Sequence, residues 1–356
     1  RVDCGAVTTQ NGQKGASRGL LILHPGALGD VVATFPAILE LRRRFRPVSL
    51  LCQGHIAALA ARLGVIDVPL ALESAGFAAL YGAPGSLRAG GRLRPCHHML
   101  VFSACPELAV TLRRCLPGAA LHRMAPRPPP DLNTHVLQHL YDQLAACGLL
   151  TPAVRPAPAA DPFRANPSPP GGDAPILLHP GAGSPRKRWP LPYFLAIAAG
   201  LEARRLQPAF LLGPAEQDLA ARLQAQQHQK RPIHRVADLA ALQQLLETAG
   251  GLIGNDSGIS HLSAFLGLPT VAVFGPSSAR RWAPSGPAAA ALQPALDCRP
   301  CFETNPANCE GAACLHGTRP ETVLETFLGL YTRGYVKKEG GGEVQRKTRP
   351  HPTGRG

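Results

Sequence analysis

Residues 20–30 read LLILHPGALGD, an apolar run followed by a glycine turn that ends in an aspartate. Four consecutive aliphatic residues predict a short strand that is buried on both faces. Apolar residues at helical spacing follow over 31–44, and a second apolar run over 48–51 predicts the next strand. A strand, a tight turn and a helix in this order predict an α/β fold with a parallel, doubly wound sheet.

The tetrapeptide HPGA of this turn recurs at residues 179–182, again directly after an apolar run. The recurrence predicts two Rossmann-like domains in tandem. Eight prolines between them predict a linker, since proline removes a backbone donor and disfavours helix in the preceding residue. The predicted organisation is a disordered segment 1–18, a first domain 19–150, the linker 151–175, a second domain 176–318, a closing helix 319–336 and a disordered basic tail 337–356.

The composition limits the classes of function. The chain has 356 residues, of which 45% are hydrophobic and 17% charged, enough apolar material for the cores of two domains. No apolar stretch reaches about 18 residues, so no transmembrane helix is expected. Residues 1–18 lack an apolar core, so no signal peptide is expected, and the ten cysteines are expected to be reduced thiols of a cytoplasmic protein.

The charge predicts an anionic partner. The formal net charge is +14, and half of it lies in residues 1–175. Only 5% of the residues are aromatic and no basic–aromatic run occurs, so nucleic acid is not an expected partner. The patterns G-x-G-x-x-G and G-x-x-x-x-G-K-[ST] are both absent, which argues against a dinucleotide oxidoreductase and a P-loop ATPase.

The first candidate site is the turn between the first strand and helix. Gly26, Ala27 and Gly29 let the backbone turn sharply and let a ligand approach. Asp30 is expected at the helix start, where the helix dipole favours the ionised carboxylate of a general base. The alternative is a plain helix cap, because aspartate favours that position.

Two further motifs follow strands of the second domain. Residues 179–190 read HPGAGSPRKRWP, where backbone N–H groups at Gly183 and Ser184 and the ammonium of Lys187 suit a diphosphate. Residues 254–261 read GNDSGISH, where Asp256, Ser257 and Gly258 offer donors to an anion and a carboxylate to sugar hydroxyls. The alternatives are a solvated basic loop and an ordinary capped turn.

Four cysteines lie close together near the end of the second domain. They are Cys298, Cys301, Cys309 and Cys314. Thiolates at such intervals bind zinc in many proteins, and a cluster of reduced thiols that holds a loop is the competing interpretation.

The set of motifs resembles glycosyltransferase family 9, the ADP-heptose:lipopolysaccharide heptosyltransferases. The stretches that carry the resemblance are HPGALGDVVATFPAILELRRRF (24–45), LLHPGAGSPRKRWP (177–190), LLGPAEQD (211–218) and GNDSGISHLSAFLGLPTVAVFGPS (254–277). The cysteine segment is also similar to cysteine-containing members. The resemblance implies a GT-B fold, in which two Rossmann-like domains face a central cleft, and an inverting transfer with no cofactor and no obligatory metal.

The resemblance also implies roles for single residues. Asp30 matches the general base, and Lys187 matches the lysine that contacts the phosphate and sugar of the donor. Asp256 matches the residue that holds sugar hydroxyls, and Glu216 an acidic residue near the ribose. Ser257 and Gly258 match the diphosphate turn, and His261 lies in the same matched stretch. At Ala182 and Gly183 some members carry hydroxyl residues, so this chain is left with backbone donors there.

The predicted function is therefore transfer of a heptose from ADP-heptose to the anionic inner core of lipopolysaccharide, at the cytosolic membrane face. One alternative keeps the chemistry and changes the nucleotide-sugar or the glycan acceptor. Others are a non-catalytic nucleotide-binding protein of the same fold and a zinc-dependent protein organised by the four cysteines.

Overall fold

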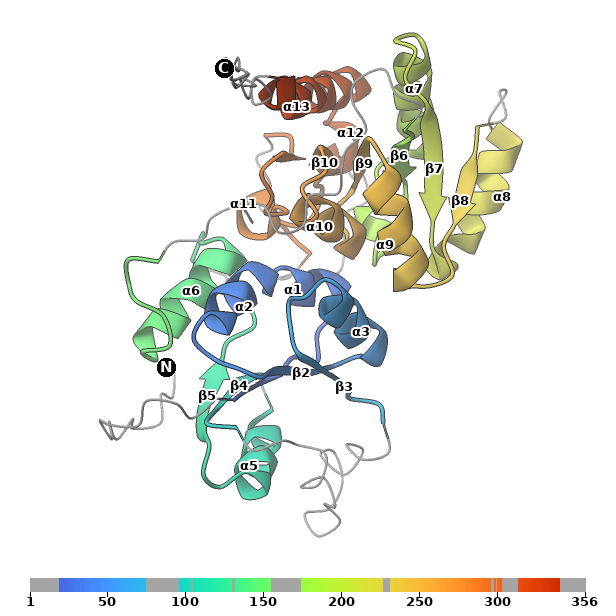
Figure 1. Ribbon diagram of the computed structural model, residues 1–356. Helices are drawn as coiled ribbons and strands as arrows, with labels where there is room; N and C mark the ends of the chain where they lie inside the picture. Colours follow the sequence, from blue (N-terminus) through green and yellow to red (C-terminus); the bar gives the residue numbers. More distant parts are fainter. Residues whose placement is uncertain are drawn as a thin grey trace, which may run out of the picture.

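The computed structural model describes residues 19–74, 96–103, 105–129, 132–154, 174–226, 231–295, 298, 300–302 and 313–339. Figure 1 shows two α/β lobes, an N-terminal lobe in blue to green and a C-terminal lobe in yellow-green to red. Each lobe contains one parallel sheet, so the predicted α/β class with two parallel sheets is confirmed.

The N-terminal lobe has a five-stranded sheet in the order β3-β2-β1-β4-β5. β1 lies at its centre because all four of its residues are aliphatic and buried. Leu20 and Ile22 face the core under α2, α3 and α6, whereas Leu21 and Leu23 face the core on the side of α5 (Figure 1). The elements are β1 (Leu20–Leu23), α1 (Leu28–Val32), α2 (Phe35–Arg42), β2 (Val48–Cys52), α3 (Gly54–Arg62), β3 (Val68–Ala71), β4 (His98–Phe102), α5 (Pro106–Cys115), β5 (Ala120–Met124) and α6 (Val136–Ala146).

The C-terminal lobe has a six-stranded sheet in the order β11-β10-β9-β6-β7-β8. The first half of the lobe comprises β6 (Ile176–His179), η2 (Pro185–Lys187), α7 (Leu191–Glu202), β7 (Pro208–Leu212), η3 (Pro214–Glu216), α8 (Gln217–Gln226) and β8 (Ile233–Arg235). The second half comprises α9 (Leu239–Thr248), β9 (Gly251–Asn255), α10 (Gly258–Phe265), β10 (Thr270–Val273), α11 (Ala279–Trp282), β11 (Ala289–Leu292), α12 (Ala313–His316) and α13 (Pro320–Glu339).

The expected single helix over 31–44 is wrong, because the structure has two helices there. α1 ends at Val32 and α2 begins at Phe35. Pro36 has no N–H to donate to the carbonyl of Val32, so a continuous helix would leave that carbonyl without its partner. Thr34 instead donates its hydroxyl and its N–H to the carbonyl of Val31 and closes the first helix.

The expected start of the basic tail at 337 needs a correction as well. α13 continues to Glu339, since the added residues Lys337, Lys338 and Glu339 are good helix formers. Phe327 and Val323 of this helix are fully buried and hold it on the sheet. The predicted disordered segment 1–18, residues 155–173 of the linker and residues 340–356 of the predicted tail 337–356 lie outside the described residues.

The two lobes are in direct contact through α1 and α10 (Figure 1). Phe35 at the start of α2 packs edge-on against Phe265 of α10, with ring centroids 5.2 Å apart. The hydrophobic core of the N-terminal lobe therefore continues into the C-terminal lobe. Among the helices that the structure describes, none combines the length and the apolar character that crossing a bilayer requires.

Candidate active site

A cleft of about 250 Å³ lies between the lobes, at the carboxyl ends of strands from both sheets. The N-terminal lobe lines it with Ala27, Gly29, Asp30 and Arg127. The C-terminal lobe lines it with Gly183, Lys187, Asp256, Ser257, Gly258, His261, Ser277, Trp282 and Phe302. The structure thus brings nine of the twelve residues predicted for catalysis, donor binding and the acceptor-side turn into one cleft.

On the N-terminal side, the turn after β1 holds Asp30 at the start of α1. The N–H of Ala27 donates to Oδ2 of Asp30 at 3.3 Å, so the carboxylate also caps the helix. A side chain at Gly26 would stand 2.6 Å from Cε1 of His24 and 2.9 Å from Cβ of Asp30. Only glycine lets the chain turn this tightly beneath the aspartate.

The side chain of His24 packs against this turn. Burial lowers the pKa of its imidazole to about 4, although the Asp30 carboxylate opposes the shift. The ring is therefore neutral at pH 7, and its Nδ1 accepts the N–H of Gly26 at 3.2 Å.

On the C-terminal side, Lys187 and Asp256 form a largely buried ion pair. Nζ of Lys187 lies 2.8 Å from Oδ2 of Asp256, and the two side chains are only 19% and 8% exposed. The ammonium also lies 4.1 Å from the ring centroid of Phe302. The cation is therefore held between a carboxylate and an aromatic face, at the wall of the cleft.

Asn255, at the end of β9, joins the two predicted donor motifs. Its amide donates to the carbonyls of Pro180 at 2.9 Å and Gly181 at 3.0 Å, and its Oδ1 accepts the N–H of Trp189 at 3.0 Å. Asn255 is completely buried, so these bonds fix the loop that carries Lys187 against the end of β9.

The N-termini of α1 and α10 meet at the cleft. Ser257 caps α10 by accepting the N–H of Ser260 at 3.3 Å. A side chain at Gly258 would stand 2.9 Å from the backbone nitrogen of Gly29 and 3.0 Å from Cβ of Leu28. The positive ends of both helix dipoles therefore lie at the same part of the cleft, which favours an anion.

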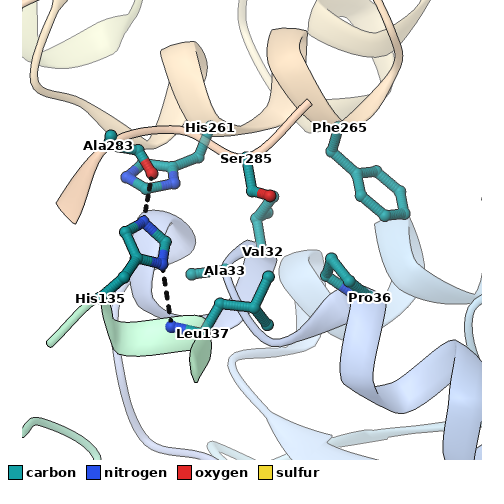
Figure 2. Close-up of a pocket in the computed structure, with 9 residues that line it drawn as sticks. All are labelled: Val32, Ala33, Pro36, His135, Leu137, His261, Phe265, Ala283 and Ser285. Carbon is teal, nitrogen blue, oxygen red and sulfur yellow. Dashed lines mark hydrogen bonds between the residues drawn. The ribbon is translucent and has the colours of Figure 1, made fainter. Parts of the chain in front are cut away.

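His261 lies in α10 between this cleft and a smaller cavity. Its side chain is 6% exposed, and burial lowers its pKa, although Asp256 and Asp30 oppose the shift. Figure 2 shows the smaller cavity, where His135 of the N-terminal lobe faces the C-terminal lobe beside His261. Nε2 of His135 donates to the carbonyl of Ala283 at 2.9 Å, and its Nδ1 accepts the N–H of Leu137 at 3.2 Å.

Three predicted site residues do not line the cleft. Gly26 packs against His24 and Asp30 beneath the turn. Ser184 accepts the N–H of Arg186 at 3.4 Å and caps η2. Glu216 is 6% exposed and accepts the N–H of Gly213 at 2.7 Å.

The cysteines form no recognised metal centre within the described part of the chain. Cys298 is exposed, whereas Cys301 and Cys314 are half-buried. Cys309 lies outside the described residues. The zinc alternative therefore stays a prediction.

Four residues that line the cleft were missed from the sequence. Arg127 and Ser277 follow β5 and β10, and the rule that ligands bind beyond the carboxyl ends of parallel strands would have indicated both. The short strand β5, ALHRM, was itself missed because His122 and Arg123 interrupt its apolar pattern. Trp282 and Phe302 do not directly follow a strand, so this rule does not indicate them.

Two Rossmann-like lobes that face a shared cleft define a protein of the GT-B class. The model of glycosyltransferase family 9 (heptosyltransferase) matches residues 151–310, in agreement with the resemblance. Lipooligosaccharide heptosyltransferase 2 of Campylobacter jejuni is 29% identical over 165 residues, which are 45% of this chain and 51% of that protein. The chain thus matches about half the length of this curated relative.

Solved structures support the same fold over most of the chain. A family 9 glycosyltransferase from Veillonella parvula has a TM-score of 0.67 and 17% identity, covering 91% of this chain and all of that one. The ADP-heptose lipopolysaccharide heptosyltransferase II of E. coli has a TM-score of 0.64 and 18% identity, covering 89% of this chain and 99% of that one. At these identities, the likeness establishes the GT-B arrangement of the two lobes.

Proposed function

We propose that the protein is an inverting glycosyltransferase that moves a heptose from ADP-heptose to the inner core of lipopolysaccharide. One observation carries the proposal: Asp30 of the N-terminal lobe and the Lys187–Asp256 pair of the C-terminal lobe line the same cleft. A carboxylate on one wall and an anion-binding wall opposite it are what this transfer requires.

The donor diphosphate binds at the wall formed by the C-terminal lobe. The N–H groups at the start of α10 and the ammonium of Lys187 neutralise its charge. Asp256 accepts hydrogen bonds from the hydroxyls of the sugar, and its own charge is balanced by Lys187. The choice of ADP-heptose rests on the resemblance and on the E. coli neighbour, which is an ADP-heptose heptosyltransferase.

Asp30 acts as the catalytic base. The acceptor hydroxyl oxygen attacks the anomeric carbon of the donor sugar while its proton passes to the carboxylate of Asp30. The bond from the anomeric carbon to the diphosphate oxygen breaks, and ADP leaves with the electron pair toward Lys187 and α10. Attack from the face opposite the leaving group inverts the anomeric configuration. We assign no cofactor to these steps.

The acceptor is the phosphorylated, acidic core of a lipopolysaccharide precursor. The excess of lysine and arginine in residues 1–175 attracts such a molecule and holds the protein near the anionic cytosolic face of the membrane. Another nucleotide-sugar or glycan acceptor is the alternative within the family, because the curated relatives match over only about half their length.

A donor panel tests the proposal. The full chain is incubated with a truncated lipopolysaccharide core acceptor and ADP-heptose, UDP-glucose or GDP-mannose, and products are read by mass spectrometry. We expect a mass gain of one heptose and release of ADP with ADP-heptose alone. Transfer from another donor would support the alternative within the family. Binding of ADP without any transfer would indicate a non-catalytic nucleotide-binding protein.

A further inference from the structure

Ser277 lies in the loop after β10, directly behind the Lys187–Asp256 pair. It is 2% exposed and lines the cleft, and although it ends the matched stretch 254–277, the sequence analysis gave it no role. Its hydroxyl donates to Oδ2 of Asp256, the same oxygen that pairs with Lys187. Two donors from separate loops therefore converge on one carboxylate oxygen.

The loop that carries Ser277 is itself fixed by hydrogen bonds. Nε2 of Gln293 donates to the carbonyls of Gly275 at 2.8 Å and Ser277 at 2.6 Å, and its Oε1 accepts the N–H of Ala279 at 3.0 Å. The N–H of Phe302 donates to the carbonyl of Pro276, also in this loop, at 3.0 Å. One loop therefore anchors both Ser277 and the aromatic ring that faces Lys187.

This arrangement restricts the orientation of the Asp256 carboxylate. The last torsion of an aspartate side chain is broad, so a single contact with a flexible lysine leaves the carboxylate free to rotate. The hydroxyl of Ser277 comes from a fixed loop and supplies a second, rigid contact. Lys187, held by that carboxylate on one side and by Phe302 on another, is then confined to one place.

We propose that Ser277 is a positioning residue for the donor diphosphate: it orients Asp256, and through Asp256 it sets where the ammonium of Lys187 stands as charge grows on the leaving group. This inference rests on the proposed function. Because the contact acts on charge that develops in the transition state, its loss lowers kcat more than it raises KM.

The variants Ser277→Ala and Ser277→Thr test the inference with ADP-heptose as donor. Loss of one hydrogen bond to a charged group predicts a roughly ten-fold lower kcat for Ser277→Ala with KM changed by less than about two-fold. Ser277→Thr keeps the hydroxyl and is expected to restore most of kcat. Ser278→Ala is the matched control, because the hydroxyl of Ser278 makes no capping hydrogen bond to α11. An unchanged kcat in Ser277→Ala would overturn the inference.

A double-mutant cycle separates positioning from general support of the loop. In the Lys187→Ala background, Ser277→Ala is expected to lower kcat by less than about two-fold, because Ser277 acts on the leaving group through Asp256 and Lys187. An equal loss in both backgrounds would show that Ser277 acts independently of Lys187 and would overturn the inference.

Calorimetry with ADP, UDP and GDP distinguishes a failure of the role inferred for Ser277 from a failure of the proposed function. If the wild type binds ADP without transferring heptose, the proposed donor fails. The same double-mutant cycle, measured as ADP affinity, still decides the role of Ser277. If Ser277→Ala weakens ADP binding only in the protein that retains Lys187, the inferred role is supported. If it weakens ADP binding equally in the Lys187→Ala variant, the inferred role is contradicted. If none of the three nucleotides binds, both proposals fail.

Discussion

The two HPGA turns have the same sequence and different roles. In both, the histidine stands at the end of a buried strand, is nearly inaccessible and has a pKa lowered by burial. His24 accepts the N–H of Gly26 within its own turn, whereas Nδ1 of His179 donates to the carbonyl of Leu211 in the neighbouring strand, at 3.0 Å. The first turn is thus self-contained, and the second is tied to its sheet.

The segment that comes after each turn decides which charge the lobe presents to the cleft. The N-terminal turn leads directly into α1, which places Asp30 at the cleft. The C-terminal turn continues into a longer loop that contains η2, and this loop places Lys187 at the cleft. A repeated turn therefore supplies a carboxylate on one wall and a cation on the other, and the first difference to test is the carboxylate of Asp30.

Asp30→Asn should have the largest effect. The amide oxygen can still accept the N–H of Ala27, so the turn is retained while the base is lost. We expect kcat to fall about 1000-fold, within the range for general-base catalysis, with ADP affinity unchanged. Steady-state kinetics and calorimetry measure the two quantities. Asp142→Asn on the exposed face of α6 is the control, and equal kcat values for the two variants would reduce Asp30 to a helix cap.

The second-largest effect is expected where the N-termini of α1 and α10 approach each other. Gly258→Ala places a methyl group 2.9 Å from the backbone of Gly29, so the lobes must separate at the cleft. We expect kcat/KM to fall about 100-fold, the cost of a displacement of about 1 Å between reacting groups. Gly29→Ala should cost less, because its methyl group stands 3.3 Å from the nearest atom.

Gly118→Ala is the control for both glycine variants, since a side chain there meets nothing within 4 Å. Circular dichroism checks that each variant is folded. If Gly258→Ala retained the wild-type kcat/KM, contact between these helices would not be needed to assemble the site.

The sequence predicted the central strands and the motifs at their ends, because buried parallel strands carry dense apolar runs. It missed the four edge strands β3, β5, β8 and β11, whose short sequences are interrupted by proline or polar residues or are alanine-rich. Nine predicted residues reached the cleft because they follow strands of the two sheets. The contact of Ser277 with Asp256 depends on packing between loops 21 residues apart, which periodicity cannot indicate.

The smallest effect concerns the stability of the N-terminal turn. The pKa of His24 falls from 6.5 to about 4 on folding, so the unfolded chain binds the proton more tightly. Its contribution to stability is complete above about pH 6.5 and is lost as the pH falls toward 4. His24→Asn should reduce the loss of unfolding free energy between pH 7 and pH 5 by about 2 kcal/mol.

Urea denaturation at the two pH values measures this difference. The other buried histidines, including His179, have pKa shifts in the same direction and remain in the variant, so only part of the pH dependence should disappear. An identical pH dependence in the variant and the wild type would show that His24 takes up a proton equally well in both states.

Our main claim is that one cleft holds a donor diphosphate opposite a carboxylate base. A crystal structure of the protein with ADP is its sharpest test. We expect diphosphate oxygens within about 3.2 Å of Nζ of Lys187 and of the N–H groups that begin α10, with Asp30 across the cleft. ADP bound at any other place, or a diphosphate out of reach of both Lys187 and α10, would contradict the claim.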